Sequence, residues 1–405
     1  MTGMATQPGR GKTALILAGG GARAAYQVGI VKAVAELLPR NAPNPFPILC
    51  GSSAGAINAA ALASSALHFH RGAEHLEAVW RNMVVSQILR TEPLHVLRHG
   101  LHWVAALLLG GIGGLNPRSL LDNSPLQALL EGHIPLIRVQ QAIDAGMLTA
   151  LAVTVCSYHS GRSISYFQGV EELAGWSRAR RIGRPAEIHY AHLKASTAIP
   201  LVFPAEEIDG RYYGDGSMRQ TAPISPALHL GADRVLVVGV QHETETPHQP
   251  GRMAYPGIGQ IAGHVLDTLF MDSLGTDLER LERINLTLKT LGSGDAGGMS
   301  VPLRQIDTLV ITPSRNLAEM AQDYIGAFPG TVRHLLRGIG VRRKQGEELT
   351  SYLLFDGNYC GALIDLGYRD AMAQREALRR FLGIEDETGP AGKAGPVSRS
   401  EEVGA

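Results

Sequence analysis

The stretch Gly51-Ser52-Ser53-Ala54-Gly55 constrains the fold of this chain more than any other feature of the sequence. It follows an apolar run at 47–50 and precedes ten small, mostly apolar residues at 54–63 that are typical of a helix. The pattern G-x-S-x-G between a strand and a helix marks a sharp turn that lifts a serine hydroxyl out of a sheet. Glycines flank the serine because side chains there would collide with the neighbouring backbone. The pattern alone also fits an ordinary loop, so the flanking strand and helix carry the prediction that Ser53 is a nucleophile.

Apolar runs typical of buried strands alternate with helix-like segments along most of the chain. The expected strands lie at 13–17, 47–50, 148–156, 163–168, 234–240 and 307–312. The expected helices lie at 25–38, 54–66, 71–89, 119–130 and 258–291. Strands that alternate with helices form a mainly parallel sheet with helices on both faces. We therefore expect an α/β fold with three layers, α/β/α, around a mainly parallel central sheet, plus a C-terminal helical extension.

Composition divides the chain into a body and two tails. Residues 1–12 and 385–405 are polar, contain Gly and Pro and have few large apolar side chains, which predicts disordered tails. The catalytic domain is expected over 13–240. A C-terminal extension is expected over 241–384, with the long helix at 258–291 and a further strand packed on the core.

Charge and cysteine content argue against several classes of protein. The 405 residues carry 37 acidic and 37 basic side chains, whereas a dedicated nucleic-acid binder shows a strongly basic face. Cys50, Cys156 and Cys360 lie far apart and match neither a disulfide framework nor a zinc site. The N-terminal residues lack the apolar core of a secretory signal, and no stretch reaches the roughly 18–20 apolar residues of a membrane span. We therefore expect a cytoplasmic protein that binds no nucleic acid.

A second glycine-rich turn joins the first expected strand to the first expected helix. It contains Gly19, Gly20, Gly21, Ala22 and Arg23. Backbone N–H groups at such a helix N-terminus form an anion site, and an acyl-transfer enzyme needs such donors for its oxyanion, at about 3–4 kcal/mol per donor. The spacing also fits a dinucleotide fingerprint, but residues 39–49 contain no acidic side chain to bind the ribose. Arg23 either orients this loop, meets a phosphate or forms a structural ion pair.

The third motif is Tyr213-Gly214-Asp215-Gly216-Ser217, which follows the run 195–204. Asp-Gly is a common hairpin turn, so this motif by itself indicates only a turn. A carboxylate held beside a serine can act as a general base if partial burial raises its pKa towards the working pH. By itself the motif leaves two roles open for Asp215, a turn residue and a general base.

Together these three motifs resemble those of the patatin-like phospholipase family. The family's glycine-rich oxyanion loop corresponds to residues 19–23, its serine elbow to 51–55, and its Asp-Gly-Gly/Ala motif to Asp215-Gly216-Ser217. The run 195–204 is similar to the family's segment that leads to the aspartate. The resemblance covers about residues 13–240, and beyond it the chain resembles only longer bacterial members.

The resemblance implies a patatin-like fold and a Ser–Asp dyad, without histidine, in which Ser53 is the nucleophile and Asp215 the base. It also implies hydrolysis of fatty-acyl esters of phospholipids, lysophospholipids or related lipids, with no metal or cofactor. Two positions depart from the family pattern. Ala24 stands where the family usually has glycine, and Ser217 replaces the usual glycine or alanine.

Several alternatives stay open at this stage. The chain has 15 histidines, so composition does not exclude a Ser–His–Asp triad. The histidines that follow Asp215, in the order expected of an α/β-hydrolase, include His229, His242, His248, His264 and His334. An acyltransferase would use the same nucleophile, and a catalytically silent lipid-binding or scaffolding protein would use the 258–291 helix as its interface.

One apolar segment, 101–115, has three open roles: core packing, lining of an acyl groove, or contact with a membrane surface. Core packing is the commonest role of apolar helical stretches. The partner that the family resemblance implies is a lipid substrate. Peripheral membrane contact and a homo-oligomer both stay open.

Overall fold

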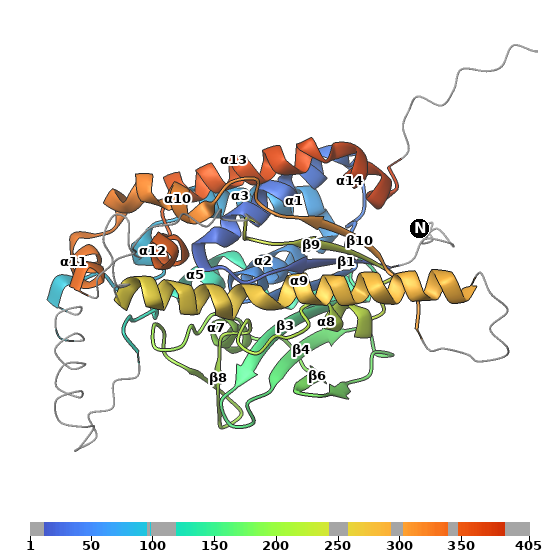
Figure 1. Ribbon diagram of the computed structural model, residues 1–405, viewed down its shortest axis with the longest axis horizontal. Helices are drawn as coiled ribbons and strands as arrows, with labels where there is room; N and C mark the ends of the chain where they lie inside the picture. Colours follow the sequence, from blue (N-terminus) through green and yellow to red (C-terminus); the bar gives the residue numbers. More distant parts are fainter. Residues whose placement is uncertain are drawn as a thin grey trace, which may run out of the picture.

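The computed structural model describes residues 12–94, 98, 119–242, 258–292, 303–338 and 347–384. Parallel strands form the centre of its sheet, in the order β10-β9-β1-β2-β3 (Figure 1). Their bounds are β1 (Thr13–Leu17), β2 (Ile48–Ser52), β3 (Ala150–Ser157), β9 (Arg234–Val238) and β10 (Asp307–Ile311). Each overlaps a strand expected from the sequence.

Further strands extend the sheet beyond β3. The strand β4 (Ser163–Gly169) is antiparallel to β3, β6 (Arg181–Pro185) is parallel to β4, and β5 (Trp176–Arg178) is antiparallel to β6. A hairpin of β7 (Glu206–Ile208) and β8 (Arg211–Gly214) joins through β8, which is antiparallel to the end of β3. The sheet is therefore parallel at its centre and mixed on one side.

Alternate residues of the central strands face opposite sides of the sheet, as the period of two requires. In β1, Leu15 and Leu17 pack into one core, and Ala14 and Ile16 pack into the other. The helices over the first core include α1 (Ala25–Leu37), α2 (Ala54–Ser64), α3 (Phe69–Arg81) and α13 (Gly357–Ala373). Those over the second include α8 (Ser225–His229) and α9 (Ile258–Gly292). The fold has three layers, α/β/α, around a mainly parallel central sheet, as expected.

The C-terminal helices pack on the body that carries the three motifs. The helix α13 lies beside α1, where the hydroxyl of Tyr26 donates a hydrogen bond to Asp370 at 2.9 Å (Figure 1). The short helix α12 (Glu347–Leu353) contacts the loop that follows β1. The remaining C-terminal helices include α10 (Leu317–Ala321), α11 (Gly330–Gly338) and α14 (Arg375–Leu382).

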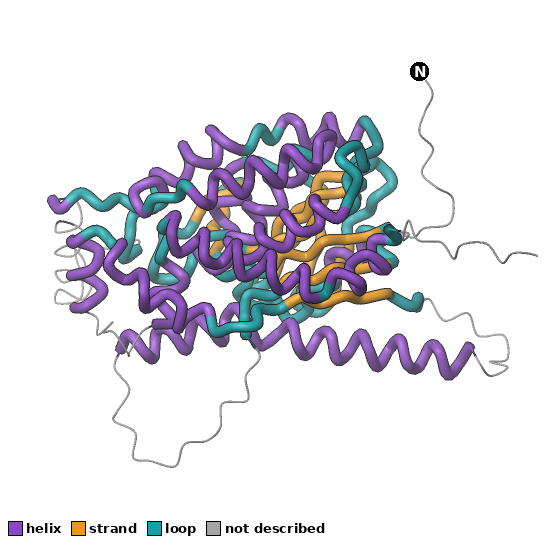
Figure 2. The backbone as a smooth tube through the Cα atoms, turned by 90° about the horizontal axis from the view of Figure 1, so that it is seen from above, coloured by secondary structure: helices purple, strands orange, loops and turns teal. Residues whose placement is uncertain are grey.

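The long helix expected at 258–291 is confirmed as α9. It lies along one flank of the body (Figure 2). Leu281 is buried, and the carboxylate of Asp277 accepts a hydrogen bond from the N–H of Ile224 at 3.1 Å. Arg280 and Arg283 face solvent. This part of α9 therefore packs on the second core through one face.

Two helix boundaries differ from expectation. The helix expected at 71–89 ends at Arg81, and Val85–Gln87 forms a separate 3-10 turn, because Val84 adopts an extended backbone that β-branched residues favour. The helix expected at 119–130 begins at Pro125 as α5 (Pro125–His133), because proline is preorganised for the first helical position. The apolar segment 101–115 and nearly all of both expected tails lie outside the described residues. Among the residues described, no helix combines the length and apolar composition needed to cross a membrane.

Candidate active site

Ser53 lies on the turn between β2 and α2. Its φ of 53° and ψ of −134° fall in a region that non-glycine residues rarely adopt, at a cost of about 1–3 kcal/mol. A Cβ on Gly51 would lie 2.4 Å from the carbonyl oxygen of Gly55, and a Cβ on Gly55 would lie 2.2 Å from that of Leu17. Both glycines are therefore required by close backbone contacts. The strand, sharp turn and helix have the order that the sequence indicated.

The hairpin of β7 and β8 brings Asp215 to this turn from a distant part of the chain. Because β8 pairs with the carboxyl end of β3, which lies beside β2, the residue after β8 reaches the serine. The hydroxyl of Ser53 donates a hydrogen bond to Oδ2 of Asp215 at 2.7 Å. The backbone N–H of Ser217 donates to Oδ1 at 2.8 Å. Gly216 fits here without a side chain, because a Cβ would lie 1.9 Å from the carbonyl oxygen of Thr154.

Burial controls the proton affinity of Asp215, which is 0% exposed. Loss of hydration raises the pKa of its carboxyl group from 3.8 to about 7, although hydrogen bonds from Ser53 and Ser217 lower it. A carboxyl group with a pKa near neutrality is a far better proton acceptor than an ordinary aspartate. The arrangement is therefore able to take a proton from the serine hydroxyl.

Ser196 is a site residue that the sequence did not single out. It ends α7 (Tyr190–Ser196), and its hydroxyl accepts a hydrogen bond from the N–H of Ser53 at 2.9 Å. The same hydroxyl donates to the carbonyl oxygen of Thr154 at 2.7 Å, and the Ser196 carbonyl accepts from the N–H of Gly216 at 3.0 Å. Ser196 thus joins the serine turn, β3 and the aspartate turn. The sequence signal that could have identified Ser196 is its place in the run 195–204, which leads to Asp215.

The glycine-rich loop after β1 ends in a 3-10 turn, Gly21–Ala24. The first N–H groups of such a turn, here those of Gly21 and Ala22, have no acceptor within it. The N–H of Arg23 is already bonded to the carbonyl oxygen of Gly20 at 3.1 Å. Gly21 has a φ of 55° and lines the same cavity as Ser53. Gly19 and Gly20 precede this turn, so the glycine-rich loop lies at the cavity that Ser53 also lines.

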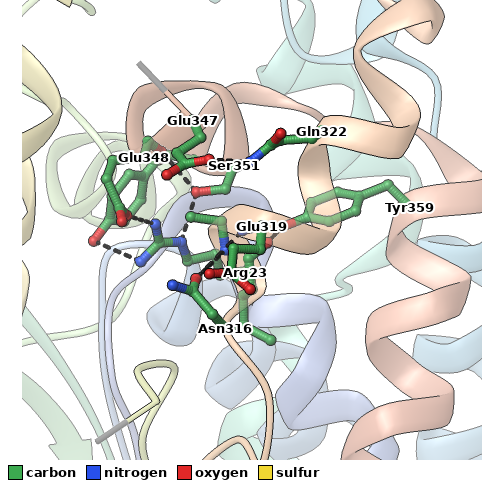
Figure 3. Close-up of polar contacts among 11 residues, drawn as sticks. Arg23, Asn316, Glu319, Gln322, Glu347, Glu348, Ser351 and Tyr359 are labelled. Carbon is green, nitrogen blue, oxygen red and sulfur yellow. Dashed lines mark hydrogen bonds and ion pairs between the residues drawn. The ribbon is translucent and has the colours of Figure 1, made fainter. Parts of the chain in front are cut away.

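The side chain of Arg23 holds this loop to the C-terminal helix α12 (Figure 3). It is 3% exposed, pairs with the carboxylate of Glu348 and donates from Nε to the hydroxyl of Ser351 at 2.7 Å. Its guanidinium also lies 4.1 Å from the centre of the Tyr352 ring. Of the roles considered for Arg23, the structure shows an ion pair that fastens the loop. Glu348 and Ser351 were not recognisable from the sequence because they lie more than 300 positions away.

A largely apolar cavity adjoins Ser53. Carbon side chains from α2, α3 and α5 form most of its wall, which includes Ile57, Val79, Trp80 and Leu130. Its empty volume, including the part open to solvent, is about 760 Å³. An apolar cavity of this size beside a serine suits a hydrocarbon chain.

The described histidines considered for a triad contact other groups. His229 stacks on Trp176 at 4.7 Å between ring centres. His242 shares a hydrogen bond with the carbonyl oxygen of Pro313, and His334 shares one with that of Gly330. His264 lies on α9, and His248 lies outside the described residues. Within the described part of the chain, the hydrogen bonds of Asp215 and of the Ser53 hydroxyl involve no histidine, and no group of three metal-binding side chains is found.

Comparison with known proteins identifies the family. The family model of patatin-like phospholipases matches residues 15–228, which contain the glycine-rich loop, Ser53 and Asp215. No curated protein matches the chain. Among solved structures, VipD from Legionella pneumophila is 12% identical, with 91% of this chain and 67% of that chain covered and a TM-score of 0.33, a level that supports no conclusion here. By its match to the family model over more than half its length, the chain belongs to the patatin-like phospholipase family.

Proposed function

We propose that this protein is a lipid acyl hydrolase in which Ser53 is the nucleophile and Asp215 the general base. Membership of the family indicates lipid acyl hydrolase activity. The observation that carries the assignment of residues is the 2.7 Å hydrogen bond from Ser53 Oγ to the buried Asp215 carboxylate. The apolar cavity beside Ser53 supports a fatty-acyl ester as the substrate.

The first half of the reaction forms an acyl-enzyme. Asp215 takes the proton of Ser53 as Oγ attacks the ester carbonyl carbon. The oxyanion of the tetrahedral intermediate accepts hydrogen bonds from backbone amides of the glycine-rich loop, at Gly20, Gly21 and Ala22. The intermediate collapses, and the proton on Asp215 passes to the departing alcohol of the lipid.

The second half releases the fatty acid. Asp215, again ionised, takes a proton from water as the water oxygen attacks the acyl carbonyl. The same loop amides hold the second oxyanion, and the proton on Asp215 returns to Ser53 Oγ as the ester bond breaks. This cycle consumes one water molecule and uses only side chains and backbone amides of the chain. Because its substrate is a lipid, the protein would work at a membrane surface, at least transiently.

The test is product analysis with phosphatidylcholine and lysophosphatidylcholine vesicles. Free fatty acid is quantified by mass spectrometry, with and without a lysophospholipid or alcohol acceptor. We expect fatty acid release by the parent protein and none by Ser53→Ala. Acyl transfer to the acceptor in place of fatty acid release would favour an acyltransferase. Absence of both products, with Ser53 unreactive, would favour a silent lipid-binding protein.

A further inference from the structure

The apolar cavity follows the helix that begins at the candidate nucleophile. Its wall includes Ser53, Ile57 and Ala61, which recur every four residues and so lie on one face of α2. Ala61 is eight residues beyond Ser53, which places it roughly 12 Å along the helix axis. The cavity is therefore a channel that leads away from the serine along α2.

The neighbouring helix α3 runs back along the same channel in the opposite direction. At the far end, a Cβ on Gly72 would lie 2.5 Å from Cβ of Ser65. Nearer the serine, Nε1 of Trp80 donates a hydrogen bond to Oδ1 of Asn58 at 2.9 Å. These two contacts fix the antiparallel register of α2 and α3. His75, which also lines the cavity, is therefore at the level of Ala61, at the end remote from Ser53.

A second histidine meets His75 at this far end. His133 closes α5, lines the cavity, and has its ring centre 5.3 Å from that of His75. His75 is exposed and His133 is half-buried, so the pair faces solvent. Between the serine and this pair, the wall from α3 and α5 is hydrocarbon, as in Val79, Leu126 and Leu129. The two imidazoles therefore mark a change from an apolar to a polar, hydrated environment.

We propose that His75 and His133 form the end of the acyl-binding channel and set the length of acyl chain that the enzyme recognises. This inference rests on the proposed function, because it assigns the channel to the acyl group on Ser53. With carbon–carbon bonds of about 1.5 Å, an extended chain advances roughly 1.3 Å per carbon, so 12 Å holds roughly nine carbons. Carbons beyond this point contact imidazole and water and are not buried, so they add nothing to the binding free energy.

The test is the kcat/KM of p-nitrophenyl esters from four to sixteen acyl carbons, at concentrations where the esters are monomeric. Burial of one methylene in the channel raises kcat/KM by roughly two- to fourfold. We expect that rise up to about nine or ten carbons and no further gain for longer chains. A steady rise to sixteen carbons, or a decline from four, would overturn the inference.

Two variants test whether the channel sets the dependence of kcat/KM on acyl-chain length. In the double variant His75→Leu/His133→Leu the apolar wall is longer. We therefore expect kcat/KM to keep rising for two or three more acyl carbons. In Ile57→Phe a ring fills the channel about 6 Å from Ser53 along α2. We therefore expect kcat/KM to stop rising at roughly five acyl carbons. Leu67→Phe is the matched control, because Leu67 is an exposed residue outside the channel wall. Both variants leaving the chain-length profile unchanged would contradict the proposal.

Labelling of Ser53 by a fluorophosphonate separates the failure of the inference from that of the proposed function. An unlabelled Ser53 and no hydrolysis of any ester would overturn the proposed function, and this inference with it. If Ser53 is labelled and esters are hydrolysed, but substitution of the histidines leaves the chain-length dependence of kcat/KM unchanged, only the inference would be overturned.

Discussion

Ser53 and Ser196 are joined by a hydrogen bond of 2.9 Å, from the backbone N–H of the first to the hydroxyl of the second. Both residues are buried, and they lie 143 positions apart, Ser53 on the turn before α2 and Ser196 at the end of α7. The bond fixes the backbone of the candidate nucleophile to the same segment that positions the turn of Asp215. Ser53 is therefore held by a hydrogen bond to its backbone N–H and by a second hydrogen bond from its hydroxyl to Asp215.

Ser196→Ala is expected to lower both stability and kcat. Its loss leaves the N–H of Ser53 and the carbonyl oxygen of Thr154 without this buried partner, which costs about 1–3 kcal/mol. The free energy of unfolding in urea and the kcat on a short ester are the measurements. An unchanged kcat in a protein of unchanged stability would show that this bond does not position Ser53.

Activity is expected to depend on pH through Asp215. Its pKa is raised to about 7 by burial, and only the ionised carboxylate accepts the serine proton. The kcat/KM should therefore rise about tenfold per pH unit below pH 7 and level off above it. A profile of kcat/KM from pH 5 to 9 with a soluble ester tests this, and a flat profile from pH 5 to 8 would contradict it.

Asp215→Asn is expected to be inactive yet more stable than the parent at pH 8. In the unfolded chain the pKa of Asp215 is about 3.9, whereas in the folded protein it is about 7. The folded state binds the proton more tightly, so the free energy of unfolding falls as pH rises from about 4 to about 7 and stays lowered above that. Asparagine carries no charge and removes this cost, on the order of a few kcal/mol. Urea unfolding of the parent and of Asp215→Asn at pH 3 and pH 8 measures this cost. Equal free energies of unfolding for the two proteins at pH 8 would contradict the buried charge.

Glu348→Gln is expected to slow the chemistry at Ser53 although Glu348 lies in the C-terminal extension. It removes the ion pair of buried Arg23 but keeps the contacts of Arg23 with Ser351 and Tyr352, so the attachment of the loop to α12 is weakened. We expect slower fluorophosphonate labelling of Ser53 and a lower kcat with little change in KM. Glu279→Gln is the matched control, because its pair with Arg283 is exposed and contributes little. Labelling rates equal to the control would show that the pair is only structural.

The sequence was most informative where the determinants are local. The turn at Ser53 was predictable because Gly51, Gly55 and the flanking strand and helix are contiguous. The strand β1 and the glycine-rich loop were predictable for the same reason. The partner of Arg23 was not, because an ion pair across the fold leaves no periodicity in either segment. The role of Asp215 entered through family resemblance, since Asp-Gly alone indicates only a turn.

Tertiary contacts account for what the sequence did not show. The helix expected at 71–89 stops at Arg81, and Met83 and Ile88, which follow it, contribute to the wall of the cavity. Ser196 carries no local sequence signal of its own, because the hydrogen bonds of its hydroxyl with Ser53 and Thr154 form only in the folded protein. His75 and His133 lie on separate helices, and only the packing of α3 against α5 brings their rings together.

The most direct test of the Ser–Asp mechanism is intact-mass analysis after treatment with a fluorophosphonate. If Asp215 activates Ser53, the parent protein gains one phosphonyl group at Ser53, Ser53→Ala gains none, and Asp215→Asn is labelled far more slowly while remaining folded. Labelling of Asp215→Asn at the parent rate, or a phosphonyl group found on a residue other than Ser53, would contradict the mechanism.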